Sequence, residues 1–115
     1  MPNIGDNTKI LASSNLTIAS SGTTSDALDV QGNVLTGMIV PAMTGTTLTF
    51  SVSFDGTTYY AYYDQYGAQP SVTVSSTARY IEIDEEDFVG AQFIKVVSGS
   101  TEASSRTITM IVRPL

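Results

Sequence analysis

Residues 47–54 alternate between small polar and apolar side chains, in the order TLTFSVSF. The apolar side chains all fall on one face: Leu48, Phe50, Val52 and Phe54. A period of two residues is typical of a strand that buries one face. Asp55-Gly56 follows directly, and the apolar run after it predicts the returning strand of a hairpin.

The rest of the chain also favours strands over helices. It contains 14 Ser and 16 Thr but only 14% charged residues, and it has no long stretch of helix-favouring Glu, Lys, Arg and Leu. Further short strands are expected over residues 34–40, 71–76, 78–84, 92–99 and 106–114, with a helical turn within 85–91. This pattern predicts an all-β, antiparallel, jelly-roll-like β-sandwich of eight or nine short strands with at most one short helical turn.

A chain of 115 residues is expected to form a single domain. Residues 1–34 contain no aromatic side chain and are expected to form an N-terminal arm and edge strands, whereas residues 35–115 form the sandwich body. Two interpretations of the first part remain open: an ordinary pair of edge strands, or an extended arm that lies on a neighbouring subunit. We expect a mixture, with the first dozen residues as the arm.

Charge and composition argue against several classes of function. The net charge is −6, and the five basic residues are never adjacent, which argues against nucleic acid and against anionic membranes as partners. The chain has no Cys and no His, so thiolate and imidazole chemistry are absent. No cofactor is expected. No targeting segment is recognisable at the N-terminus, and synthesis in the cytoplasm is expected.

The acidic run Asp84, Glu85, Glu86 and Asp87 is the densest cluster of charge. Acidic side chains suit the free amides at the start of a helical turn. Alternatives are contact with a partner, calcium binding, or glycoside hydrolysis by paired carboxylates that include Glu82. The run lacks EF-hand spacing, no motif singles out a nucleophile, and we expect neither a metal site nor an enzyme.

The segment YYAYY places Tyr59 and Tyr63 on one face of a strand and Tyr60 and Tyr62 on the other. These tyrosines are open to three interpretations: cross-strand packing, an oligomer or partner interface, or a carbohydrate platform. We predict that Tyr59 and Tyr63 are the more buried pair. Tyr60 and Tyr62 are then candidate interface residues, together with the acidic run and the arm residues Ile10 and Leu11.

Residues 37–115 resemble small virion structural proteins of tailed bacteriophages. The resemblance rests on four successive motifs: GMIVPA, LTFSVSFDGTTYYAYYDQYG, ARYIEIDEEDFVGAQFIKVVSG and RTITMIVRPL. The rhythm of VSFDGTTYY followed by ARYIEI also resembles galactose-binding-type jelly rolls, and this second likeness concerns the fold.

The first resemblance implies a head decoration or cement protein on the capsid surface of the virion. Its implied partners are the major capsid protein and further copies of the chain, as a dimer or trimer. No catalytic or ligand-binding residue follows from it. The alternative function is a carbohydrate- or receptor-binding β-sandwich module of a head or tail fibre.

Overall fold

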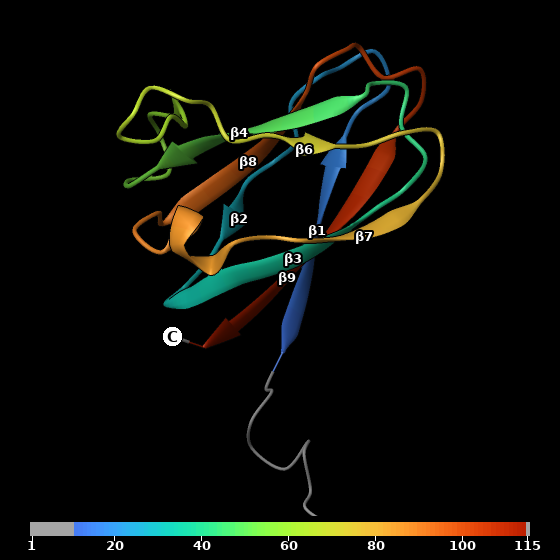
Figure 1. Ribbon diagram of the computed structural model, residues 1–115. Coiled ribbons are helices and arrows are strands. Elements are labelled where there is room, and N and C mark those ends of the chain that lie inside the picture. Colours follow the sequence, from blue (N-terminus) through green and yellow to red (C-terminus); the bar gives the residue numbers. More distant parts are fainter. Residues whose placement is uncertain (1–10, 115) are drawn as a thin grey trace, which may run out of the picture.

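A computed structural model describes residues 11–114, which form nine strands and one short 3-10 turn (Figure 1). The strands are β1 (Ala12–Ile18), β2 (Leu28–Asp29), β3 (Asn33–Val40), β4 (Thr47–Ser53), β5 (Tyr60–Ala61), β6 (Val72–Thr73), β7 (Arg79–Glu82), β8 (Phe93–Ser98) and β9 (Arg106–Pro114). The turn, η1, spans Glu85–Phe88. The predicted all-β fold is confirmed. Within the described residues, no helix has the length and apolar character needed to cross a membrane.

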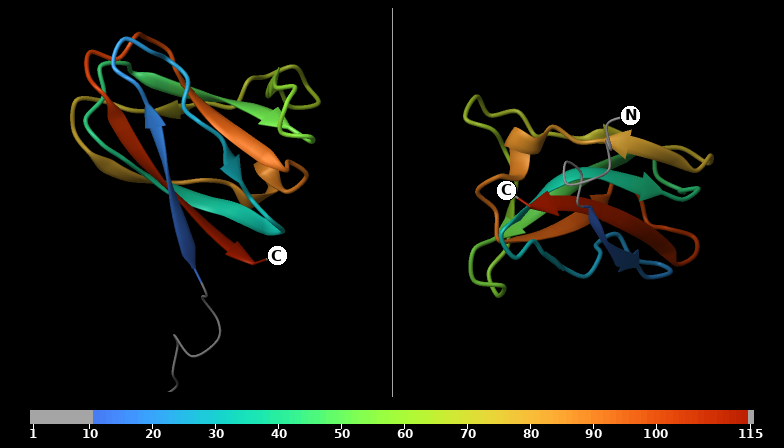
Figure 2. Two further views of the ribbon diagram at one scale, coloured as in Figure 1. Left: turned by 180° about the vertical axis from the view of Figure 1, so that it is seen from behind. Right: turned by 90° about the horizontal axis from the view of Figure 1, so that it is seen from below.

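The strands form two antiparallel sheets that face each other (Figure 2). The first sheet has the order β1-β9-β3-β7, and the second has the order β2-β8-β4-β5, with β6 also paired to β4. Consecutive long strands change sheets repeatedly, since β3 leads to β4 and β8 leads to β9. The predicted two-sheet sandwich is therefore confirmed.

A hydrophobic core fills the space between the sheets. In β4 the predicted inward face is correct, because Leu48, Phe50 and Val52 are all buried. The facing sheet contributes alternate residues of β9, namely Ile108, Met110 and Val112. Burial of these apolar side chains supplies the main driving force for folding, at about 25 cal/mol per Å².

The alternation of β4 ends one residue earlier than predicted. Ser53 is fully buried and Phe54 is 67% exposed, so the assignment of Phe54 to the core is wrong. The hydroxyl of Ser53 donates to Asp55 Oδ1 at 3.0 Å, and the same oxygen accepts the amides of Thr57 and Thr58. These hydrogen bonds build a turn that begins at the end of β4, and Phe54 lies on the solvent side of that turn.

This wide turn changes the faces of the tyrosines. β5 pairs Tyr60 with Val52, and the amide of Tyr62 donates to the carbonyl of Phe50 at 2.9 Å. Because opposed residues of an antiparallel pair share a face, Tyr60 and Tyr62 lie on the core side of the sheet. Tyr62 is half-buried, and Tyr63 is 55% exposed, so the predicted burial of these two is wrong. Tyr60 is 62% exposed, as predicted.

Tyr59 is half-buried, in line with its predicted burial, but it lies on the outer face of the second sheet and not on the expected core face. Its ring lies under the ammonium of Lys95, with Nζ 4.2 Å from the ring centroid. Such a cation–π contact contributes about 0.5–1 kcal/mol at an exposed site.

The N-terminal segment contributes both edge strands that were considered. β1 pairs with β9 along its whole length, and β2 pairs with β8 at Leu28 and Asp29. The proposed arm lies almost entirely outside the described residues, and so does Ile10. Leu11 is the first described residue, and its side chain is exposed.

The segment from β7 to η1 follows the sequence-based prediction. Ile83 is buried and Ile81 packs partly against the core, whereas Tyr80 and Glu82 are exposed. The predicted helical turn forms at Glu85–Phe88. It is held to the body by Phe88, which is buried.

Phe88 is the aromatic anchor of this turn, because its ring lies 4.8 Å from that of Phe50 and 5.1 Å from that of Tyr62. Replacement of Phe88 by Ala leaves a cavity, and we expect a loss of about 3–5 kcal/mol in the free energy of unfolding. Urea denaturation measures this loss. The neighbouring exposed side chain provides the matched control, because Val89→Ala should change the same free energy by less than about 0.5 kcal/mol. Equal effects of the two substitutions would contradict the anchoring role.

Candidate partner-binding surface

The acidic run forms the start of η1. Asp84 is the N-cap residue, and its side chain accepts the amide of Glu86 at 3.1 Å. A side-chain oxygen at this position satisfies a backbone donor that has no partner within the turn. The acidic run therefore has the structural role expected of it, because Asp84 caps the start of the helical turn.

Glu85 ties the turn to the end of β9. Its two carboxylate oxygens accept from Arg113 Nε at 2.8 Å and from Arg113 Nη2 at 2.5 Å. The hydrogen bonds from Arg113 hold the pKa of Glu85 below its ordinary value, against the opposing effect of burial. Both side chains are about two-fifths exposed, so solvent screens much of this attraction.

Asp87 has acidic neighbours and no basic one among the groups that shift its pKa. Its partial burial raises its pKa, and the negative charges of Asp84, Asp64 and Glu86 raise it further. Burial also raises the pKa of Tyr62, with further increases from Asp87, Asp64 and Asp84. The acidic side chains around Tyr62 therefore create a locally negative potential, which would attract a cationic group of a partner.

An open groove of about 680 Å³ borders the start of η1. Leu11, Thr36 and Tyr80 contribute to its wall, and the remaining lining residues are Glu82, Ile83, Asp84, Glu85, Glu86 and Arg113. Four carboxylates against one guanidinium give this groove a negative charge. Thr36 lies at a β-bulge in β3, because the pairing of β3 with β9 skips it.

Tyr80 covers the backbone of Gly37, the residue that follows this bulge. A Cβ atom at position 37 would overlap the hydroxyl and ring of Tyr80, so only glycine allows the tyrosine to lie this close. Tyr80 also lines the groove.

Four exposed aromatic residues belong to β5 or to the loops that follow β4 and β5. We call these residues the aromatic surface: Phe54, Tyr60, Tyr63 and Tyr66. Tyr66 is 85% exposed at the tip of a turn in which Asp64 Oδ1 accepts the amides of Tyr66 and Ala68, both at 2.9 Å. In Figure 1 these yellow-green loops and the orange η1 lie on the same side of the molecule.

The structure brings most of the sequence-predicted interface residues to one region. Tyr62 packs against Phe88 of η1, and Leu11 lines the groove together with Glu85 and Glu86. Tyr60 belongs to the adjacent aromatic surface. Sequence reasoning missed Phe54 and Tyr66 as exposed aromatics, although the turn-forming DQYG around Tyr66 could have indicated an exposed position.

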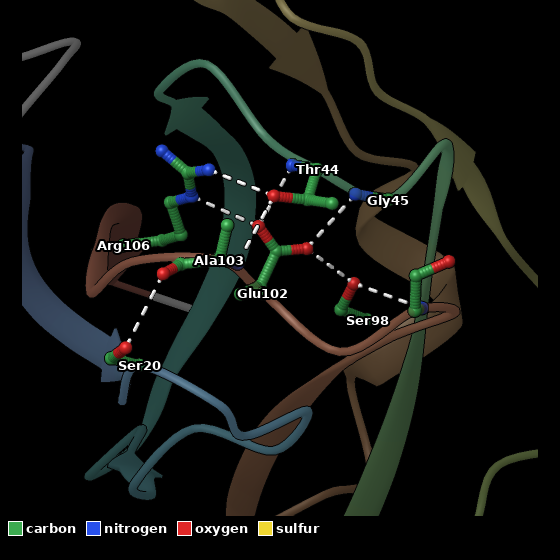
Figure 3. Close-up of polar contacts among 8 residues, drawn as sticks. Ser20, Thr44, Gly45, Ser98, Glu102, Ala103 and Arg106 are labelled. Carbon is green, nitrogen blue, oxygen red and sulfur yellow. Dashed lines mark hydrogen bonds and ion pairs between the residues drawn. The ribbon is translucent and has the colours of Figure 1, made fainter.

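Sequence reasoning also missed Glu102, a charged side chain that is fully buried. Its carboxylate accepts the amides of Thr44 and Gly45 at 2.8 and 3.0 Å, the Ser98 hydroxyl at 2.7 Å and Arg106 Nε at 2.9 Å (Figure 3). Glu102 is the only charged residue in the loop SGSTEASS, and Arg106 follows four residues later. That isolated charge was the one sequence feature that could have indicated a buried ion pair with Arg106.

The hydrogen bonds determine the charge state of this carboxyl group. Burial by itself would raise its pKa, because it disfavours the ionised form. The amides of Thr44 and Gly45, the Ser98 hydroxyl and Arg106 outweigh burial and lower the pKa of Glu102 from 4.5 to about 2. Glu102 is therefore ionised at neutral pH, with its charge shared among four donors.

Glu102 connects three loops that cross between the sheets. Its side chain binds the β3–β4 loop at Thr44 and Gly45, and it belongs itself to the β8–β9 loop. Its backbone exchanges hydrogen bonds with the β1–β2 loop, where the amide of Ser21 donates to the Glu102 carbonyl and the Glu102 amide donates to the carbonyl of Gly22. The role of Glu102 is structural, and it lies away from the aromatic surface.

Among residues 11–114, no group of three or more acidic side chains is close enough to hold a metal ion.

The sequence matches no protein-family model, and no curated protein matches it. Among solved structures, the fold is similar to that of the SPBc2 prophage-derived protein YomS, with a TM-score of 0.55 at 12% identity over 90% of this chain and 95% of that chain. The Yersinia pseudotuberculosis-derived mitogen has a TM-score of 0.39 at 12% identity, over 92% and 86% of the two chains. At such identity the likeness to YomS shows the fold alone.

Replacement of Glu102 by Gln should lower the free energy of unfolding at pH 7 by about 2–4 kcal/mol, because Arg106 loses its buried partner and backbone amides lose a charged acceptor. The folded-state pKa lies below the unfolded value, so this contribution is fully present above pH 4.5 and is lost as the pH falls toward 2. Denaturant unfolding at several pH values should show the two proteins converging over that interval.

Glu86→Gln is the matched control, since Glu86 is exposed, and it should have little effect at any pH in this range. A constant difference between wild type and Glu102→Gln from pH 7 to pH 2 would show that the ionised carboxylate is not the source of the stability.

Proposed function

We propose that this chain is a structural virion protein of a tailed phage, a capsid decoration or cement protein that binds and stabilises the capsid lattice. The observation that carries this proposal is the exposure of Phe54, Tyr60, Tyr63 and Tyr66 beside the acidic turn. Clusters of exposed aromatic side chains are typical of protein-binding surfaces, since each ring supplies a large contact area at small cost in conformational entropy.

The fold and the sequence resemblance support the assignment to a phage particle. The chain shares its fold with a prophage-derived protein, and residues 37–115 resemble small virion structural proteins. The scarcity of catalytic groups, with no Cys and no His in the sequence, favours a binding role over an enzymatic one.

The chemistry of the surface indicates what the partner must offer. The aromatic rings would enter apolar depressions, and the negative potential around Tyr62 and Asp87 would meet lysine or arginine side chains. The partner in this proposal is the major capsid protein, whose outer surface would supply these groups across a seam between subunits. The protein would be made in the host cytoplasm and would reside on the capsid surface as a dimer or trimer, without contact to nucleic acid or membrane.

The proposal is tested with capsids assembled without this protein. Purified wild-type protein should sediment with these capsids at a fixed ratio of copies to capsid subunits. The double variant Tyr63→Ser/Tyr66→Ser should bind at least about 30-fold more weakly, because truncation of a hot-spot tyrosine at an interface costs about 2 kcal/mol or more. The capsids should also resist heating better with the wild-type protein bound.

Tyr80→Ser is the control, because Tyr80 is also an exposed aromatic but belongs to the groove. It should weaken binding far less than the double variant does. Absence of wild-type binding would overturn the proposal, and equal binding by wild type and double variant would show that the aromatic surface does not make the contact.

A carbohydrate- or receptor-binding module of a head or tail fibre is the second candidate. It is favoured by the high exposure of Tyr66, because a tyrosine at a loop tip can stack on a sugar ring. A glycan array distinguishes the two candidates. Binding to a defined glycan that disappears with Tyr66→Ser would favour the module, whereas capsid binding without glycan binding would favour the decoration protein.

A further inference from the structure

The free edge of β1 differs from the other sheet edges of the described chain. β1 is seven residues long and contains no charge and no proline, with the sequence ASSNLTI. β7, at the opposite edge of the same sheet, has four residues and includes Arg79 and Glu82. The edge strands of the second sheet have two residues each. Proteins usually protect long edges with charge, proline, bulges or a covering segment, because unpaired backbone groups attract another strand.

Hydrogen bonding shows which backbone groups of β1 face outward. The amide of Thr17 donates to Asp26 Oδ1 at 2.7 Å and therefore points away from β9. The pairing of β1 with β9 runs without a shift from Ala12 to Ile18. Since amide directions alternate along a strand, the N–H and C=O groups of Ser13 and Asn15 also point outward.

Within the described residues, only the end of this outward edge is covered. Asp26 occupies the amide of Thr17, and Ile18 forms an isolated bridge with Ser25. The preceding part is open, since every residue from 11 to 15 is exposed. Figure 2 shows β1, in blue, at the outside of its sheet next to β9.

We propose that this edge binds the same edge of a second copy, so that the two four-stranded sheets join into one continuous sheet. An antiparallel pair of identical strands has two-fold symmetry, which is the commonest symmetry of protein dimers. The pairing centres on Ser14, so that Ser13 of one copy lies opposite Asn15 of the other. This register uses the outward N–H and C=O groups of both residues and stops where Asp26 already satisfies Thr17.

Charge favours a second copy at this edge over contacts elsewhere on the molecule. Each copy has a net charge of −6, so contact between acidic surfaces such as those around η1 would be repulsive. Residues 12–18 contain no charge, and two copies can approach along them at the smallest electrostatic cost. This inference concerns self-association and does not depend on the proposed capsid partner.

A single cysteine tests the register directly, because the natural chain has no cysteine. In the proposed pairing, Ser14 lies opposite itself at a position where Cα atoms are about 4.5 Å apart, which suits a disulfide. Ser14→Cys should become a disulfide-linked dimer under mild oxidation, while Ser71→Cys, exposed in the loop before β6, should remain mostly monomeric.

The matching equilibrium experiment is sedimentation of the natural chain, which should be a dimer at micromolar concentration. Ser13→Pro removes an outward amide while leaving the bonds to β9 in place, and we expect dimerisation to weaken at least tenfold. Ser13→Ala keeps that amide and should dimerise as the natural chain does.

Three results would overturn the inference. These are a natural chain that remains monomeric at about 100 μM, a Ser14→Cys variant that cross-links no better than Ser71→Cys, or a Ser13→Pro variant that folds normally and dimerises unchanged. The natural chain would remain monomeric if another strand occupied this edge, either one from the capsid protein or one from residues 1–10.

Discussion

The buried carboxylate of Glu102 organises the end of the sandwich where the chain crosses between sheets. It holds the β3–β4 loop through the amides of Thr44 and Gly45, and its own backbone holds the β1–β2 loop. Gly45 must be glycine, because a Cβ there would lie 2.5 Å from Ser98 Oγ and 3.3 Å from Glu102 Oε2. One residue thus connects three loops that are far apart in the sequence, through its ionised side chain and its backbone.

The two ends of the second sheet therefore carry different structural features. β4 runs from the Glu102 end to the aromatic surface, and β8 runs from η1 back to the Glu102 end. Phe50 and Phe88 pack together between these ends and connect the core to the acidic turn. The exposed tyrosines and the acidic turn are consequently presented from a framework that is fixed at both its core and its opposite end. A rigid support of this kind reduces the entropy lost when a partner binds.

Local periodicity predicted most of the fold, because residues two apart report the face of a strand wherever the strand is continuous. Leu48, Phe50 and Val52 are buried for this reason, and η1 forms where acidic residues can cap a turn. The prediction failed where a turn of unexpected length changed the register, which reversed the burial of Tyr62 and Tyr63 and exposed Phe54. Glu102 escaped notice because the amides that lower its pKa are those of Thr44 and Gly45, which lie 58 and 57 positions earlier in the sequence.

The central claim is that this sandwich uses its aromatic and acidic end to bind the capsid of a phage particle. The most direct measurement is a cryo-electron microscopy map of the phage particle whose genome encodes this chain. Our account predicts a nine-stranded sandwich on the outside of the capsid shell, with the loops after β4 and β5 against the major capsid protein. A complete particle map that contains the protein only in the tail, or lacks it entirely, would contradict the account.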